Sequence, residues 1–307
     1  MRAIITGGTG LIGSRLAASL AQAGHEVIVL SRNPDKHALP QGVRAEKWDA
    51  RTAAGWGHLA DGAGAIINLA GENISGTGAL PARWTTERKQ RIAESRLHAG
   101  QAVVEAVRQA ANKPEVVYQA SGSDYYGWGD RLFTENDAAG DAFLASVVTD
   151  AWEPATAAVE AMGVRRVIGR QGPVMSMDGG PLPFSVFQFK LFAGGRLGSG
   201  NQWMSWIHIE DAVRAIQYLV GNKQAQGVYN IAAPNPVTNK EFTQVLGQVM
   251  GRPTLIPAPA FALKLALGEI SALVLEGQRI DVQKLRELGF TFNYPDLRLA
   301  LLDLLKR

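Results

Sequence analysis

Short apolar runs alternate with longer amphipathic stretches along the first half of the chain. The runs rich in apolar and β-branched residues are 2–6, 26–30, 45–48, 65–69, 115–120 and 166–169. The stretches with apolar residues one helical turn apart are 11–23, 85–111 and 141–162, and we expect Pro154 to kink the last of them. Such alternation is typical of βαβ units and a parallel sheet. It predicts an α/β fold of the Rossmann type, with a doubly wound parallel sheet.

The rhythm changes after about residue 172, where glycine- and proline-rich stretches occupy 178–181 and 194–200. We expect a smaller C-terminal lobe to begin there. Residues 227–231 again have the composition of a strand, which predicts that the chain returns to the sheet. The expected division is a Rossmann domain of 1–171 joined by 203–232, and a smaller lobe of 172–202 and 233–307.

Composition removes several classes of protein from consideration. The 307 residues include no cysteine, which excludes disulfides, thiolate metal sites and cysteine nucleophiles and fits a reducing compartment, so we expect a cytoplasmic protein. The longest apolar stretch, 260–275, is interrupted by Lys264 and by Gly268-Glu269, so no membrane partner is expected. The formal net charge is +3, and the lysines and arginines are not gathered in one basic block. The five histidines do not have the spacing of metal ligands. We therefore expect neither a nucleic-acid partner nor a metal site.

A glycine-rich turn joins the first predicted strand to the first predicted helix. Its residues are Thr6-Gly7-Gly8-Thr9-Gly10-Leu11-Ile12-Gly13. Gly7 suits a tight turn, Gly10 lets the backbone approach a pyrophosphate, and Gly13 permits close packing of helix on strand. The free amides of Leu11 and Ile12, together with the helix dipole, favour a diphosphate. This predicts a dinucleotide site, the alternative being a tight turn of another α/β protein.

Cofactor choice is expected at the end of the second strand, where NAD-specific folds carry an acid for the ribose 2′-hydroxyl. This chain has Ser31-Arg32-Asn33 there. A guanidinium can pair with a 2′-phosphate, and no carboxylate stands at the strand end to repel it. Ser31 and Arg32 therefore predict NADP(H) as the cofactor, the alternative being that Arg32 is only a solvent-exposed charge.

Three further segments lie in an ordered series along the chain. They are Asn68-Leu69-Ala70-Gly71, Ser121-Gly122-Ser123 with Tyr125-Tyr126-Gly127, and Trp206-Ile207-His208-Ile209-Glu210-Asp211. With the glycine turn they resemble the extended short-chain dehydrogenase/reductase superfamily, and more closely its atypical bacterial branch of epimerase family proteins. The resemblance implies that Leu69, Ala70 and Gly71 pass close to the cofactor riboses and that Gly172-Pro173 flanks the nicotinamide. An ordinary strand exit is the alternative for 68–71.

The catalytic pair of that superfamily is missing. The resemblance implies a serine after the fifth strand and a Tyr-x-x-x-Lys pair on the next helix, where the lysine lowers the pKa of the tyrosine. None of the six tyrosines has a lysine four places on, and 141–162 contains neither residue. By register against Glu153, the two positions fall on Ala145 and Thr149.

The remaining catalytic candidates are Ser121, Ser123 and Tyr126. Ser121 or Ser123 would hydrogen-bond a substrate oxygen, and Tyr126 would act as a displaced acid. For Tyr126 the alternative is an apolar wall of the cleft with a satisfied hydroxyl.

Two functions remain open. The first is an NADP(H)-dependent oxidoreductase or epimerase-like enzyme that holds an unidentified small molecule between the Rossmann crevice and the smaller, substrate-binding lobe. The second is a non-catalytic NADP(H)-binding sensor or regulatory protein. The absent tyrosine and lysine favour the sensor, whereas the serine segment and the full second lobe favour the enzyme. Substrate and oligomeric state are not determined by the sequence.

Overall fold

The computed structural model describes residues 1–36, 38–76 and 81–306. Its centre is a seven-stranded sheet in the order β11-β7-β5-β4-β1-β2-β3, in which every neighbouring pair is parallel. The strands are β1 (Arg2–Thr6), β2 (Glu26–Ser31), β3 (Val43–Lys47), β4 (Ala65–Asn68), β5 (Val116–Gly122), β7 (Arg165–Gln171) and β11 (Gly227–Ile231). The predicted α/β fold with a doubly wound parallel sheet is confirmed, and the chain returns to the sheet as edge strand β11.

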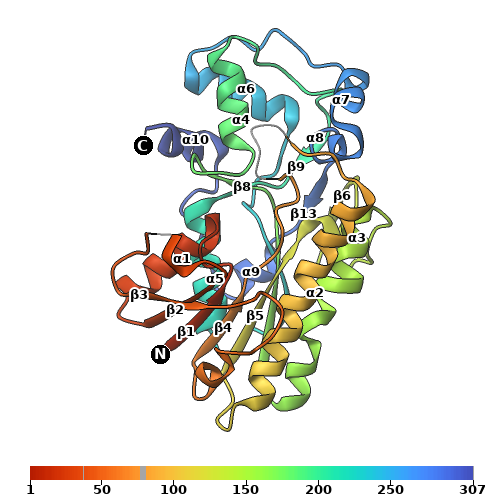
Figure 1. Cartoon of the computed structure of the whole chain (residues 1–307). Coiled ribbons are helices and arrows are strands. Elements are labelled where there is room, and N and C mark those ends of the chain that lie inside the picture. Colours follow the sequence, from red (N-terminus) through yellow and green to blue (C-terminus); the bar gives the residue numbers. More distant parts are fainter. Residues whose placement is uncertain (37, 77–80, 307) are drawn as a thin grey trace.

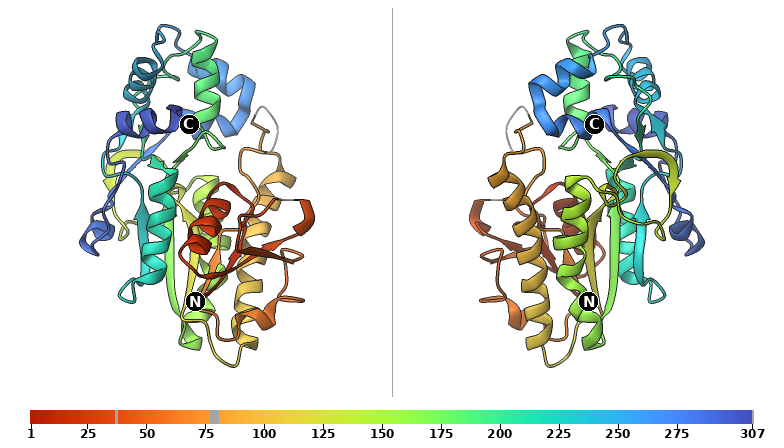
Figure 2. Two further views of the ribbon diagram at one scale, coloured as in Figure 1. Left: turned by 90° about the vertical axis from the view of Figure 1, so that its left-hand side faces the viewer. Right: turned by 90° about the vertical axis from the view of Figure 1, so that its right-hand side faces the viewer.

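Helices cover both faces of this sheet (Figures 1 and 2). On one face α1 (Leu11–Gln22) packs beside α5 (Ile209–Gly221), and on the other lies α2 (Thr86–Gln109). Successive residues of a strand point to opposite faces of the sheet and belong to different hydrophobic cores. Ile5 and Val29 lie under α1 and α5, whereas Ile4 and Ile28 lie under α2. Burial on both faces explains why the strands are continuous apolar runs.

The segment predicted as one helix over 141–162 consists of three helical segments of different types. It begins as α3 (Phe143–Val147), widens to a π-helical turn η4 (Val148–Trp152), and ends as the 3₁₀ segment η5 (Pro154–Met162). Pro154 has no amide hydrogen and its ring displaces the carbonyl one turn earlier. The Glu153 amide accordingly donates to the carbonyl of Val148 at 3.0 Å, five residues back. The expected irregularity at Pro154 is therefore a widened turn.

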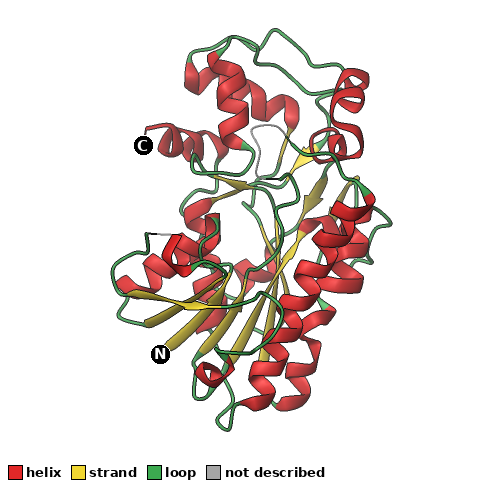
Figure 3. Ribbon diagram, viewed as in Figure 1, coloured by secondary structure: helices red, strands yellow, loops and turns green. Residues whose placement is uncertain are grey.

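A smaller lobe of helices lies beyond the carboxyl ends of the strands (Figures 1 and 3). Its helices are α4 (Leu182–Lys190), α6 (Asn239–Met250), α7 (Ala260–Leu267), η6 (Gly268–Ser271) and α8 (Ala272–Leu275), and α10 (Leu297–Lys306) packs against α6. Helix α6 begins with a capping box between Thr238 and Glu241. This placement leaves the strand ends facing the lobe, which is where open α/β sheets bind ligands.

Short strand pairs join the part of the chain that holds the central sheet to the smaller lobe. They are β6 (Gly129–Phe133) with β13 (Gln278–Ile280), β8 (Val174–Met175) with β10 (Ile207–His208), and β9 (Trp203–Met204) with β12 (Val237–Thr238). The remaining elements are η1 (Pro34–Lys36), η2 (Gly57–Ala60), η3 (Ser123–Tyr126) and α9 (Gln283–Glu287). No helix in the described part of the chain is both long and apolar enough to span a membrane.

Candidate functional site

The carboxyl ends of β1 and β4 are tied together at the point where the strand order reverses. Thr6 is fully buried, and its hydroxyl donates to the side-chain oxygen of Asn68 at 2.5 Å. The same hydroxyl accepts from the amides of Leu69 (3.1 Å) and Ala70 (3.2 Å). Thr6 thus positions the segment Leu69-Ala70 beside the glycine turn.

The glycine turn lies between that segment and α1, with no room for side chains. Gly7 has a φ of +66°, and a Cβ there would lie 2.8 Å from the Leu69 carbonyl oxygen. A Cβ on Gly13 would lie 2.4 Å from the Gly7 oxygen and 2.7 Å from the Gly8 Cα. These contacts explain why glycine occupies both positions.

The opening of α1 fits a diphosphate. Gly10 precedes the helix in an extended conformation, and no side chain caps the helix. The first-turn amides, including those of Leu11 and Ile12, have no intrahelical partners. A Cβ on Gly10 would meet only the Gly7 oxygen within 4 Å, at 3.2 Å, so space above the helix is open. Free amides at the positive end of a helix dipole are what a diphosphate requires.

Arg32 follows β2 at the same edge of the sheet. Its side chain is exposed, and no ion pair or hydrogen bond engages its guanidinium among the described residues. Ser31 is buried, and its hydroxyl accepts from the amide of Asn33 at 3.2 Å. This turn presents Arg32 to solvent with its hydrogen-bond donors free.

The structure places the three catalytic candidates together at the exit of β5, where each hydroxyl already has a partner. Ser121 donates to Glu153 (2.7 Å) and Ser123 accepts from Gln278 (2.7 Å). The Tyr126 hydroxyl donates to Asn230 at 2.7 Å. All three candidates are buried. Burial raises the pKa of Tyr126 to about 12, which makes it a poor proton donor near neutral pH.

Arg170 holds this network together from β7. It makes a two-pronged ion pair with Glu153, at 2.8 and 3.0 Å, and donates to the Tyr126 hydroxyl at 3.1 Å. Its guanidinium also lies 3.2 Å from the ring centroid of Tyr125. A buried, paired arginine of this kind fixes the position of the β5 exit.

Gly172 and Pro173 join the end of β7 to neighbouring segments. The Gly172 amide donates to the Ile231 carbonyl at 3.0 Å, and the Pro173 carbonyl accepts from the Ile207 amide at 3.0 Å. A Cβ on Gly172 would lie 1.9 Å from the Ser205 carbonyl oxygen. The segment is therefore packed tightly at the carboxyl end of β7, the strand next to β5.

Two charged residues outside the predicted site, Arg96 and Asp124, lie near the ends of β4 and β5. Arg96 on α2 is buried, and its guanidinium lies over Trp152 at 4.4 Å. A Cβ on Gly71 would lie 3.0 Å from the Arg96 Cζ. Asp124 is half-buried, with one carboxylate oxygen 3.1 Å from where a Gly122 Cβ would stand.

Burial raises the pKa of Asp124 to about 6, although the charge of Arg96 opposes the shift. Asp124 therefore changes charge close to neutral pH. The signal in the sequence was a carboxylate directly after Ser123, which a search for serine, tyrosine and lysine passes over.

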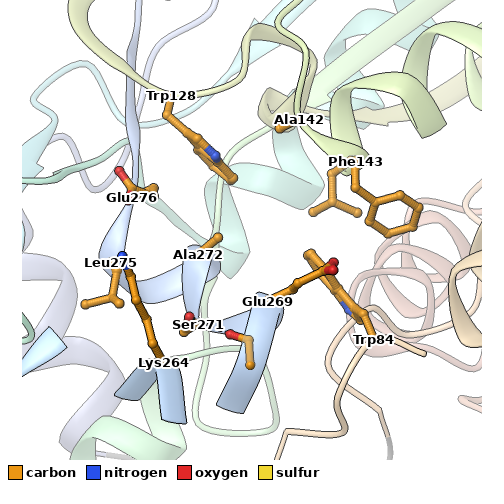
Figure 4. A pocket seen from close by; sticks show the side chains of 12 residues that line it. Trp84, Trp128, Ala142, Phe143, Lys264, Glu269, Ser271, Ala272, Leu275 and Glu276 are labelled. Atoms are coloured by element: carbon orange, nitrogen blue, oxygen red, sulfur yellow. Dashed lines mark hydrogen bonds between the residues drawn. The ribbon is translucent and has the colours of Figure 1, made fainter. Parts of the chain in front are cut away.

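A cavity of about 490 Å³ lies between α3 and the α7–α8 segment (Figure 4). Aromatic rings of Trp84, Trp128 and Phe143 line it from the Rossmann half. Lys264, Glu269, Ser271, Ala272, Leu275 and Glu276 line it from the smaller lobe. Its volume is in the range of small-molecule sites. Within residues 1–36, 38–76 and 81–306, no group of three or more potential metal-ligating side chains is present.

Strand order, glycine turn and the crevice between β1 and β4 define a Rossmann-type protein of the short-chain dehydrogenase/reductase class. The NAD dependent epimerase/dehydratase family model matches residues 3–232, and a domain of unknown function (DUF1731) matches 258–304. The chain belongs to the NAD dependent epimerase/dehydratase family, as the predicted resemblance to the epimerase family proteins implied.

Relatives match over nearly the whole length. The chain is 39% identical to the epimerase family protein YfhF of Bacillus subtilis, over 99% of this chain and 98% of that protein. It is 39% identical to the chloroplastic SDR39U1 homolog of Arabidopsis thaliana, over 98% of this chain and 86% of that protein. The crystal structure of human epimerase family protein SDR39U1 (isoform2) with NADPH has a TM-score of 0.89 and 31% identity, covering 100% of both chains.

Proposed function

We propose that the chain binds NADP(H) across the crevice between β1 and β4 and acts on a small molecule as an oxidoreductase or epimerase-like enzyme. The observation that carries the proposal is the uncapped start of α1, which Gly7 and Gly13 hold against the exit of β4. Thr6, Leu69, Ala70 and Gly71 form the facing wall, where the riboses would lie. The human relative was crystallised with NADPH, which supports the same cofactor here.

Arg32 would select the phosphorylated cofactor. Its exposed guanidinium has free donors for a 2′-phosphate, and Ser31 precedes it at the end of β2. A guanidinium pairs well with the doubly charged phosphate, whereas it gains little from the 2′-hydroxyl of NAD(H). NADP(H) is therefore the proposed cofactor.

The reaction would take place near the ends of β5 and β7, with Gly172-Pro173 beside the nicotinamide. When bound, the cofactor supplies or accepts a hydride. Asp124 is the group that we propose to exchange the proton with a substrate oxygen, because it is partly exposed and titrates near neutral pH. Ser121, Ser123 and Tyr126 would position this exit through their existing hydrogen bonds.

Turnover of NADPH with a panel of compounds tests the proposal. The panel consists of nucleotide sugars and of uncharged ketones and aldehydes. Nicotinamide absorbance reports hydride transfer, and product analysis reports epimerisation. We expect turnover of at least one compound, a large loss in Asp124→Asn and partial recovery in Asp124→Glu. Turnover that Asp124→Asn leaves unchanged would refute the role of Asp124.

A non-catalytic NADP(H)-binding sensor is the second candidate. It is favoured by Ala145 and Thr149 at the expected positions of the tyrosine and lysine, and by hydroxyls that are already engaged. Tight NADPH binding without turnover or epimerisation of any compound in the panel would favour this candidate over the enzyme.

A further inference from the structure

The cavity between the Rossmann half and the smaller lobe is held open by contacts that cross it. The Arg83 guanidinium donates to the carbonyl oxygens of Leu265 (2.6 Å) and Ala266 (3.1 Å), at the end of α7. Lys89 on α2 forms an ion pair with Glu269. Both contacts fasten the α7–α8 wall to the α2 region, so the space exists before a ligand binds. A preformed site of this kind lowers the entropic cost of binding.

Aromatic side chains form broad apolar surfaces around the cavity. Figure 4 shows Trp84, Trp128 and Phe143 around the same space as the α7–α8 side chains. Trp84 and Phe143 meet edge to face with ring centroids 5.1 Å apart. The Trp84 indole nitrogen donates to the carbonyl of Ile74 at 2.9 Å, which holds that ring in place. Fixed aromatic faces of this kind favour a ligand that is itself a ring.

The charged side chains of the cavity do not suit a diphosphate. Among the described residues, the charged side chains of its lining are Lys264, Glu269 and Glu276, and none is an arginine. Glu269 is neutralised by Lys89, and Arg83 is engaged with backbone carbonyls. A diphosphate without a guanidinium fork, and close to the free Glu276 carboxylate, would be poorly stabilised.

The free polar groups suit neutral substituents instead. Among the described residues, neither Lys264 nor Glu276 has a side-chain partner. An ammonium donates to a carbonyl or hydroxyl oxygen, and a carboxylate accepts from a hydroxyl. The two groups therefore offer one donor and one acceptor at the edge of an otherwise apolar space.

We propose that this cavity binds an uncharged cyclic carbonyl or hydroxy compound and disfavours nucleoside diphosphate sugars. The proposal deepens the proposed function and rests on it for the reaction, because it names the substrate class, but binding can be measured without turnover. The ring would stack against Trp84 and Trp128, and Lys264 and Glu276 would bind its oxygen substituents.

Ligand-observed NMR titrations of the full chain test this, with α-tetralone as the uncharged bicyclic ketone and UDP-glucose as the charged alternative. Ala272→Phe places a ring inside the cavity from α8, and Ala142→Phe does so from the opposite wall. Ala158→Phe is the matched control, because Ala158 is an exposed alanine of η5 that does not line the cavity. Circular dichroism and NADPH titration of each variant report folding and the cofactor site.

The proposal predicts that α-tetralone binds the unchanged chain at least about tenfold more tightly than UDP-glucose. A filling variant that folds should weaken α-tetralone binding at least about tenfold, whereas Ala158→Phe should not. Tighter binding of UDP-glucose, no binding of α-tetralone, or α-tetralone binding that survives both filling variants would overturn the proposal. If NADPH binds in those cases, the cavity assignment alone fails; if NADPH does not bind, the proposed function fails separately.

Discussion

Replacing Gly13 by alanine tests the dinucleotide site through a single added methyl group. In the structure that methyl carbon would lie 2.4 Å from the Gly7 oxygen and 2.7 Å from the Gly8 Cα, whereas ordinary contact begins at 3.4 Å. Both neighbours are backbone atoms, so α1 has to move away from the turn by about 1 Å to relieve the overlap. Overpacking of this size lowers the free energy of unfolding by about 1–3 kcal/mol.

The same displacement should weaken cofactor binding. Hydrogen bonds from the amides of Leu11 and Ile12 to a diphosphate are effective only within about 2.7–3.2 Å, so a shift of about 1 Å removes most of their strength. We expect the dissociation constant for NADPH, measured by nicotinamide fluorescence, to rise about tenfold or more, equivalent to about 1.4 kcal/mol.

Gly221→Ala is the matched control for this experiment. Gly221 ends α5, and nothing lies within 4 Å of a Cβ there. The same chemical change should leave NADPH binding unaltered and keep or slightly increase the free energy of unfolding, by less than about 1 kcal/mol. A folded Gly13→Ala variant that binds NADPH within about twofold of the unchanged chain would show that the close packing at Gly13 does not control cofactor binding.

Three further substitutions probe cofactor choice, the core and pH dependence. Arg32→Ala should weaken NADPH binding about tenfold or more in calorimetry and leave NADH binding unchanged; equal losses would contradict the 2′-phosphate role. Tyr118→Phe should raise the free energy of unfolding in urea by about 1 kcal/mol, because the buried Tyr118 hydroxyl has no partner among the described residues; a loss of that size would contradict this. Burial raises the pKa of Asp124 from 3.8 to about 6, so the protonated carboxyl is favoured in the fold and that stability is lost as pH rises through 6. Relative to Asp124→Asn, the unchanged chain should therefore lose up to about 3 kcal/mol of unfolding free energy between about pH 4 and 7, and parallel pH profiles would contradict the burial of the carboxyl.

The sequence was sufficient to predict the fold and the position of the glycine turn after β1, because these signals are local. The glycines at 7, 10 and 13 act on neighbours within the same turn, and apolar periodicity marks each strand and helix separately. Parallel βαβ connections then restrict the strand order. Arg32 could be selected because it directly follows β2.

The interior of the site was not predictable in the same way, because its contacts join distant positions. Ser123 is held by Gln278, 155 positions away, and Tyr126 by Asn230, 104 positions away. The raised pKa of Asp124 comes from its burial in the folded chain, which a spacing pattern does not reveal. The widened turn before Pro154 likewise depends on hydrogen-bond geometry, although the proline itself signalled an irregularity.

Calorimetric titration of NADPH and NADH into the folded, unmodified chain tests whether the opening of α1 holds a dinucleotide. We expect saturable binding of one NADPH per chain, at least about tenfold tighter than NADH. Absence of saturable binding for both nucleotides would contradict the assignment of the α1 opening as a dinucleotide site.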